Sequence, residues 1–278
     1  MTQQWWRISV DCRPEDTDAV AAALVAATGQ GVEEPADGRL LTVETSEENA
    51  KRVVGALVAS FPALEGIVTP LDPVDWSVKW RDGIITRRFG RLVVTPSWLP
   101  VVPADNEVLV SLDPESAFGS GEHGSTRAAM TLLERHLKPG DRVLDFGSGS
   151  GILAIAAAQL GAVTAIGIEV DDESHPIAEA NAEKNGVTDR VTFLVGDAAE
   201  LGVLAGPAEV LCSNILRTVN TLLLPAIQKA LVPGGVAIFA GMEDMEEELF
   251  RPVLQRAGFT VIDDVHDAGW WGVAARFG

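Results

Sequence analysis

The chain has 278 residues, 47% of them hydrophobic, which is enough apolar material for a large domain with a second small one and excludes global disorder. Lysine and arginine together number 21 and aspartate and glutamate 40, so the net charge of −19 disfavours direct nucleic-acid binding and favours a basic partner, unless the charge serves solubility alone. The two cysteines lie far apart, so we expect neither a disulfide nor a metal site and a cytoplasmic location. The N-terminus does not fit a signal peptide, and the apolar stretch 152–168 does not fit a membrane span, so we expect no membrane partner.

Residues 1–72 are predicted to form a small α+β domain. Their apolar residues recur at strand or helix spacing, and Ser46 is placed to cap a helix. The expected strands are residues 5–10, 40–43 and 65–71, and the expected helices are residues 15–28 and 47–60. Asp37-Gly38 marks the turn of a hairpin that ends in the second of these strands. The resulting order, β-α-β-β-α-β, is that of a ferredoxin-like domain.

A linker is predicted over residues 73–90, and a second domain over 91–278. In the second domain, short apolar strands alternate with amphipathic helices, which predicts a Rossmann-like α/β fold with a mixed, mostly parallel sheet covered on both faces. The expected strands are residues 91–95, 108–111, 143–145, 165–169, 191–195, 210–213, 236–240, 259–262 and 271–275, and helices are expected at 124–137, 152–160 and 173–185 and between the later strands.

A glycine-rich turn between the strand at 143–145 and the helix at 152–160 is the strongest functional signal. Asp145 is followed by Gly147, Gly149 and Gly151 in the pattern D-x-G-x-G-x-G. Glycines at a strand–helix turn let the backbone approach a ligand at the carboxyl edge of the sheet. A dinucleotide-binding loop, G-x-G-x-x-G, requires its third glycine at position 152, which is isoleucine, so a dehydrogenase is disfavoured.

Three polar residues at later strand ends extend this candidate site. Glu169 ends the next strand, where a carboxylate accepts hydrogen bonds from both hydroxyls of a ribose. Asp197 follows the third strand, and it either accepts a hydrogen bond from an adenine amino group or caps the next helix. Asn214 follows the fourth strand, and its amide oxygen is either placed to orient a substrate amine or belongs to a plain turn.

The glycine pattern resembles motif I of class I methyltransferases, and a second, longer segment makes the resemblance specific. The segment 112–127, LDPESAFGSGEHGSTR, is similar to the D-P-x-x-A-F-G-[TS]-G-x-H-x-[TS]-T-R signature of the PrmA-type methyltransferases, which modify the eleventh protein of the large ribosomal subunit. Residues 75–80, 96–98 and 214–216 also resemble that family. The similarity covers about residues 72–277 well and the first 70 residues only in pattern.

The resemblance implies S-adenosylmethionine as cofactor, with contacts at Thr126, Gly147, Glu169 and Asn214. It also implies that the ferredoxin-like domain grips a basic ribosomal protein, which suits the net charge of −19. The chain departs from the family pattern at four places. Glu169 stands where aspartate is usual, Ser148 where cysteine is frequent, Gly124 where proline usually follows the histidine, and Arg217 where alanine often follows the N-I-L motif.

Methyl transfer to an amine requires no metal, but the amine must first lose its proton. His123 is the best ionisable candidate for a catalytic role, although ordering of its own loop by hydrogen bonds is an equal alternative. Glu122 is a weaker candidate, and a solvated position suits it better. The tryptophans at 76, 80 and 98 either line a substrate groove or, more in keeping with their size, pack in a core.

Three hypotheses follow. The first is a protein N-methyltransferase that acts on lysine side-chain or N-terminal amines of a ribosomal protein. The second is an enzyme of the same fold that acts on another protein lysine or on a small amine. The third is a cofactor-binding scaffold without activity, which the retained glycines, Glu169 and Asn214 disfavour. A monomer is expected by default.

Overall fold

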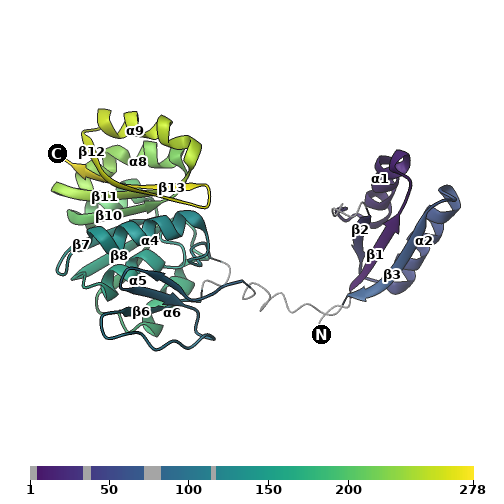
Figure 1. The fold of residues 1–278 in the computed structure, drawn as a ribbon, viewed down its shortest axis with the longest axis horizontal. Coiled ribbons are helices and arrows are strands. Elements are labelled where there is room, and N and C mark those ends of the chain that lie inside the picture. The colour runs from purple at the N-terminus through teal and green to yellow at the C-terminus, as the bar shows by residue number, and fades with distance from the viewer. Residues whose placement is uncertain (1–4, 34–38, 72–82, 114–116) are drawn as a thin grey trace. The chain divides into compact units, whose positions relative to one another are not determined.

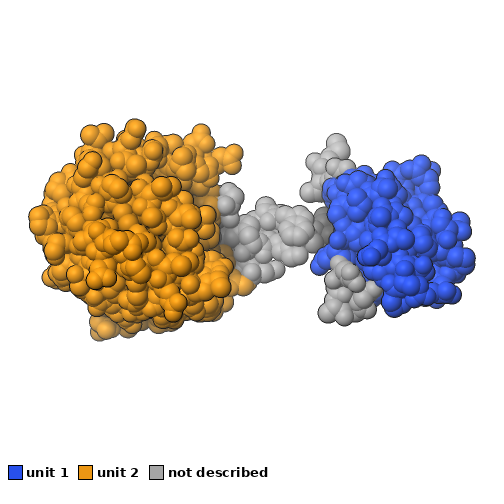
Figure 2. All heavy atoms as spheres, turned by 90° about the horizontal axis from the view of Figure 1, so that it is seen from above, with its two compact units in different colours: residues 1–82 blue, residues 83–278 orange. Residues whose placement is uncertain are grey.

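The structure is a computed structural model that describes residues 5–33, 39–71, 83–113 and 117–278. The chain divides into two compact units, Met1–Asp82 and Gly83–Gly278 (Figure 2). Within the described residues, no helix combines the length and the apolar composition that a membrane crossing requires.

The first unit is an antiparallel sheet with two helices (Figure 1). Its described elements are β1 (Trp5–Asp11), η1 (Pro14–Asp16), α1 (Thr17–Thr28), β2 (Leu40–Glu44), α2 (Glu47–Ser60) and β3 (Glu65–Leu71). The strand order is β2-β1-β3, and both neighbours run antiparallel to β1. Ile8 and Val10 of β1 face a core with apolar residues of both helices. Ser46 caps α2 as predicted, since its side chain accepts from the Asn49 N–H at 3.3 Å.

The described elements follow the ferredoxin-like order, except that one of the expected strands is only a single bridge. Where a further strand was expected before the hairpin turn, the structure has a single bridge between Glu33 and Leu41. The turn residues Asp37 and Gly38 lie outside the described residues, as do Trp76 and Trp80 of the predicted linker. Arg87–Phe89, also assigned to the linker, form strand β4, so the predicted linker end at residue 90 is wrong. The prediction failed because a three-residue strand carries too little periodicity to register in the sequence.

The second unit is built on a seven-stranded sheet in the order β12-β13-β11-β10-β7-β8-β9. Its strands are β7 (Arg142–Phe146), β8 (Thr164–Glu169), β9 (Val191–Val195), β10 (Ala208–Asn214), β11 (Leu231–Glu243), β12 (Phe259–Asp267) and β13 (Trp270–Phe277). The strands from β11 to β9 are parallel, and the β12–β13 hairpin adds antiparallel strands at one edge. The predicted mixed, mostly parallel sheet is therefore confirmed.

Helices cover both faces of this sheet (Figure 1), so its strands are buried on both sides. They are α4 (Gly124–His136), α5 (Ile152–Gln159), α6 (His175–Lys184), α7 (Ala198–Ala205), α8 (Arg217–Ala230) and α9 (Glu247–Arg256), with η2 (Asp244–Glu246) before the last. One apolar cluster joins α4 and α5 to one face, and a second joins α8 and α9 to the other. A small sheet of β4, β5 (Leu92–Thr95) and β6 (Val108–Ser111) packs into the first cluster.

Candidate functional site

The glycine turn after β7 has the backbone that the sequence predicted. Gly147, Gly149 and Gly151 have φ angles of 74°, 49° and 82°, the left-handed region in which only glycine is free of strain. A side chain has no room there either: an added Cβ would lie 2.6 Å from Ile215 at the first glycine, from the Phe118 carbonyl at the second and from Phe193 at the third. The loop is therefore closely packed on its protein side.

Glu169, at the end of β8, holds this turn. One carboxylate oxygen accepts from the Gly149 N–H at 3.0 Å, and the other accepts from the N–H groups of Val170 at 2.8 Å and Asp171 at 3.1 Å. The carboxylate therefore reaches from the end of β8 back to the loop. The side chain is half-buried, so its outer side stays open to a ligand.

The glycine turn and the signature segment, separate motifs in the sequence, are one structure in space. Ser150 of the turn donates its N–H to the Phe118 carbonyl at 2.9 Å and its hydroxyl to the Gly119 carbonyl at 2.8 Å. Buried Asn181 of α6 joins them, since its amide donates to the carbonyls of Ser150 at 3.0 Å and Asp113 at 3.2 Å. Asn181 was not predicted as a site residue, because nothing in the sequence around a helical asparagine indicates a contact with a residue 68 positions away.

Three buried side-chain atoms within the described residues lack a hydrogen-bond partner, and all three belong to predicted site residues. They are both carboxylate oxygens of Asp145 and the amide oxygen of Asn214. The Asn214 amide nitrogen donates to the Thr126 hydroxyl at 3.2 Å, which fixes the orientation of the amide. Buried polar atoms without partners are rare in native proteins, so these oxygens are expected to meet a ligand or water.

The environment of Asp145 disfavours a charge. Complete burial raises the pKa of Asp145 to about 7, and the nearby charge of Glu169 adds to this rise. The Ala154 N–H approaches the carboxyl and offsets part of the effect, without reaching hydrogen-bond geometry. Cys212 faces Asp145 across the β7–β10 pair, and burial raises the pKa of its thiol as well. A cationic ligand group near Asp145 would restore its charged form.

An apolar pocket of about 430 Å³ opens beside Asn214. Its lining consists of Phe118, His123, Ser125, Asn214, Ile215, Leu216, Val219, Gly241 and Trp270. Two of these residues also contact the glycine turn: Ile215 faces Gly147, and Phe118 accepts from Ser150. The pocket therefore adjoins the glycine turn, with the unpartnered amide oxygen in its wall.

His123 lines the same pocket. Its ring lies 4.2 Å from the Trp270 ring and 5.4 Å from the Phe118 ring, measured between centroids. Its Nδ1 pairs with the Ser125 hydroxyl at 2.8 Å. Burial lowers the pKa of His123, and the Arg127 charge lowers it further, so the imidazole is neutral at neutral pH. Both sequence alternatives are met in part, since His123 orders its loop and also faces the pocket.

Comparison with known proteins assigns this arrangement to a family. The family model for ribosomal protein L11 methyltransferase (PrmA) matches residues 39–277. The chain belongs to this family.

Two relatives and one solved structure give the extent of the similarity. The ribosomal protein L11 methyltransferase of Thermus thermophilus is 38% identical over 221 residues, covering 78% of this chain and 85% of the relative. That of Pelotomaculum thermopropionicum is 34% identical over 245 residues, covering 87% and 77%. The crystal structure of a ribosomal protein L11 methylase from Lactobacillus delbrueckii subsp. bulgaricus is 29% identical, with a TM-score of 0.63, and the match covers 70% of this chain and all of that one.

Membership of the PrmA family confirms the predicted fold class and enzyme class. The protein is an S-adenosylmethionine-dependent methyltransferase. The residues present fit this cofactor on three counts. The turn admits only glycine, the Glu169 carboxylate stands at the neighbouring strand end, and Asp145 and Asn214 carry unpartnered acceptor oxygens.

The remaining predicted residues are placed as follows. Thr126 is buried in the first turn of α4, where it pairs with Asn214. Asp197 caps α7, since one carboxylate oxygen accepts from the Ala199 N–H at 2.8 Å, and its exposed side chain leaves the other oxygen accessible. Glu122 is not a solvated loop residue, because it pairs with Arg87 at 2.6 Å and fixes the strand that was missed in the sequence.

Proposed function

We propose that this PrmA-family enzyme transfers methyl groups from S-adenosylmethionine to amines of ribosomal protein L11, the protein for which its relatives are named. The observation that carries the proposal is the unpartnered Asn214 amide oxygen, which lies in the wall of an apolar pocket next to the glycine turn. A primary amine supplies the N–H donor that this oxygen lacks.

The pocket suits an amine that has lost its proton. An ammonium has no lone pair, and a lysine has an ordinary pKa near ~10.4, so the site must favour the neutral form. The nearly apolar lining disfavours the ammonium by desolvation. An N–H of the neutral amine would donate to the Asn214 oxygen, which fixes the direction of the nitrogen lone pair. Such positioning is worth up to ~7–11 kcal/mol in well-oriented reactions.

His123 is the ionisable group that shares this pocket. Its lowered pKa keeps the ring neutral at neutral pH, and a neutral imidazole does not repel an incoming ammonium. With Nδ1 held by Ser125, the second ring nitrogen remains to take the proton released by the amine, in the tautomer in which Ser125 accepts from Nδ1. We therefore assign Asn214 the orienting role and His123 the role of proton acceptor.

The cofactor would be held by the turn and its neighbours, and when bound it supplies a methyl group activated by the sulfonium charge. We assign Gly147, Gly149 and Gly151 to close backbone contact with it. Glu169 would accept from its ribose hydroxyls. The set is completed by Asp145, Thr126, Asp197 and Asn214, with Asp145 accepting from the cofactor's ammonium group and Asp197 from its adenine amino group.

Recognition of the protein substrate is proposed to rest on charge and on the N-terminal domain. A net charge of −19 favours encounter with a basic partner and disfavours direct contact with nucleic acid. The ferredoxin-like domain, residues 1–72, would bind the ribosomal protein, with the segment after it as a linker. We propose that the enzyme acts in the cytoplasm as a monomer.

The test is incubation of the full-length protein with recombinant L11 and isotopically labelled S-adenosylmethionine, followed by intact mass. Mass gains in steps of one labelled methyl are expected, and Gly147→Arg should abolish them. Asn214→Leu, which keeps size but removes the amide, should slow methylation about 100-fold through misplacement of the amine. Leu222→Ala, at an exposed apolar residue of α8, is the control that keeps activity.

Cofactor binding without any mass gain on L11 would move the proposal to another protein lysine or a small amine. Absence of cofactor binding would refute the function altogether.

A further inference from the structure

The outer edge of β6 is covered by a helix instead of by another strand. β6 is the last strand of the small sheet, and Leu112, just after it, donates its N–H to the Thr95 carbonyl of β5 at 2.9 Å. The residues on either side, Ser111 and Asp113, direct their backbone N–H and C=O groups away from β5, toward α6. Such groups at the edge of a sheet need partners when they are taken out of water.

Two asparagines of α6 supply these partners. The side-chain oxygen of Asn185 accepts from the Ser111 N–H at 2.8 Å, and its amide donates to the Ser111 carbonyl at 2.6 Å. Asn181 does the same for Asp113, with distances of 3.0 Å and 3.2 Å. Helix residues four apart are separated by about 6 Å along the axis, and strand residues two apart by about 6.6 Å, so the two spacings match. The helix therefore pairs with the edge of β6 as a neighbouring strand would.

Asn181 also holds the glycine turn. Its amide nitrogen donates a second hydrogen bond to the Ser150 carbonyl at 3.0 Å, and the residue is 1% exposed. Ala178, three residues earlier in α6, lies against the same turn, since an added Cβ at Gly151 would be 3.3 Å from the Ala178 Cβ. Asn185 differs, because the third hydrogen bond of its amide goes to the Asn181 carbonyl at 2.7 Å. Within the described residues, none of its side-chain hydrogen bonds reaches the turn.

The Ser150 carbonyl belongs to the peptide group that joins Ser150 to Gly151. A peptide group is planar, so a hydrogen bond that fixes its carbonyl fixes the orientation of the Gly151 N–H as well. The glycines of the turn have no side chains that could hold it, and their φ angles are free to change. The orientation of this peptide therefore depends on hydrogen bonds from outside the turn, and Asn181 makes one of them.

We propose that Asn181 is a positioning residue for S-adenosylmethionine, which holds the peptide between Ser150 and Gly151 in the orientation that cofactor binding requires. It acts through the glycine turn and not by contact with the cofactor. The inference rests on the cofactor-binding part of the proposed function and is independent of which amine is methylated. Asn185 offers a matched comparison, because it pairs with the same edge of β6 without touching the turn.

The test measures the Kd for S-adenosylmethionine by calorimetry and the Tm by thermal unfolding, on the full-length protein. Asn181→Ala and Asn185→Ala should both lower the Tm, because each removes an amide that makes three hydrogen bonds. Asn181→Ala should raise the Kd about tenfold, and Asn185→Ala should leave it within about twofold of wild type. With recombinant L11 as acceptor, Asn181→Ala should raise the KM for the cofactor and leave kcat unchanged, because the groups around the amine do not move.

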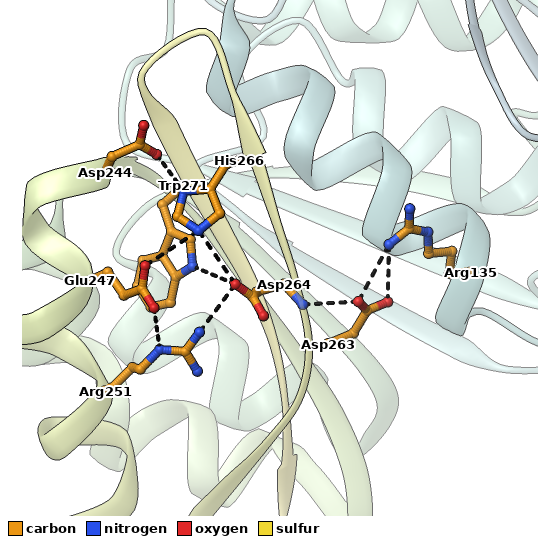
Figure 3. A network of polar contacts seen from close by, with 8 residues as sticks. All are labelled: Arg135, Asp244, Glu247, Arg251, Asp263, Asp264, His266 and Trp271. Atoms are coloured by element: carbon orange, nitrogen blue, oxygen red, sulfur yellow. Dashed lines mark hydrogen bonds and ion pairs between the residues drawn. The ribbon is translucent and has the colours of Figure 1, made fainter.

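The β12–β13 hairpin supplies a control for loss of stability, because a separate polar network fixes it to α9 (Figure 3). The Trp271 indole donates to Asp264 at 3.3 Å, and Arg251 of α9 pairs with the same carboxylate at 3.1 Å. In the part of the chain that the structure describes, no hydrogen bond or ion pair of Asp264 reaches the glycine turn. Asp264→Ala should therefore lower the Tm and leave the Kd for the cofactor within about twofold of wild type.

Two results would overturn the inference while the wild-type protein binds the cofactor. One is a Kd for Asn181→Ala within about twofold of that for Asn185→Ala. The other is an equal rise in Kd for Asp264→Ala, since loss of stability alone would then account for the effect. Should Asn181→Ala not fold, Asn181→Ser is judged by the same comparison, because its hydroxyl is too short to bridge Ser150 and Asp113. A wild-type protein that does not bind the cofactor would instead refute the proposed function, so the two failures are distinguishable.

Discussion

Replacing Gly149 by alanine should weaken cofactor binding strongly without unfolding the protein. Gly149 has a φ of 49°, which costs an alanine about 1–2 kcal/mol. Its Cβ would also lie 2.6 Å from the Phe118 carbonyl oxygen, whereas ordinary contacts begin at 3.4 Å, so one backbone segment must shift by about 0.8 Å. That shift is incompatible with the loop as it stands.

The shift acts on the contacts between the glycine turn and the signature segment. Ser150 makes two hydrogen bonds to carbonyls of that segment, at 2.9 Å and 2.8 Å, each worth about 0.5–1.5 kcal/mol net. Strain and lost hydrogen bonds together disfavour the native loop by about 2–5 kcal/mol. Because each 1.4 kcal/mol is about a tenfold change, we expect affinity for S-adenosylmethionine to fall at least about 30-fold.

Gly186→Ala is the matched control. Its φ of 64° imposes a similar backbone strain, but an added Cβ at Gly186 meets nothing within 4 Å. Isothermal titration calorimetry should show wild-type affinity for Gly186→Ala. Thermal unfolding should show a loss of about 1–2 kcal/mol for Gly186→Ala and a larger loss, up to about 2–5 kcal/mol, for Gly149→Ala. Binding by Gly149→Ala within threefold of the control would refute the argument from close packing.

Two further predictions concern Asp145 and the hairpin tip. Because its pKa is raised, the Asp145 carboxyl must lose a proton before it pairs with a cofactor ammonium group. Calorimetry should therefore show the affinity of the wild-type protein for the cofactor rising up to about tenfold from about pH 6 to about pH 8. Asp145→Asn should remove this pH dependence. The pKa of Asp145 is higher in the folded than in the unfolded protein, so the wild-type protein loses stability as pH rises toward about 7. Without cofactor, Asp145→Asn should therefore gain stability relative to wild type as pH rises toward about 7. A difference in Tm that does not change with pH would contradict this. Ala268→Asn should stabilise the second unit by about 0.5–1 kcal/mol, because asparagine tolerates the positive φ at this exposed position, and Tm should rise by about 1–4 °C.

The sequence determined those parts of the site that depend on neighbouring residues. The strand, glycine turn and helix from Arg142 to Gln159 follow from apolar periodicity and from glycines at positive φ, and both are local properties of the backbone. The cap at Ser46 is likewise read from adjacent residues. The carboxyl edge of a parallel sheet then brings Asp145, Glu169 and Asn214 together, because successive strand ends meet there.

Only the tertiary structure decided what these residues contact. Strand β4 lies within the range predicted as a linker, and its Arg87 pairs with Glu122. The raised pKa of Asp145 depends on its complete burial. The close approach of the Trp270 ring to Gly124 joins positions 146 residues apart in the chain. Periodicity and turn chemistry encode local conformation, whereas burial and distant contacts arise when helices and the edge hairpin pack on the sheet. The sequence therefore specified the glycine turn, and the packing of the fold built the apolar pocket beside it.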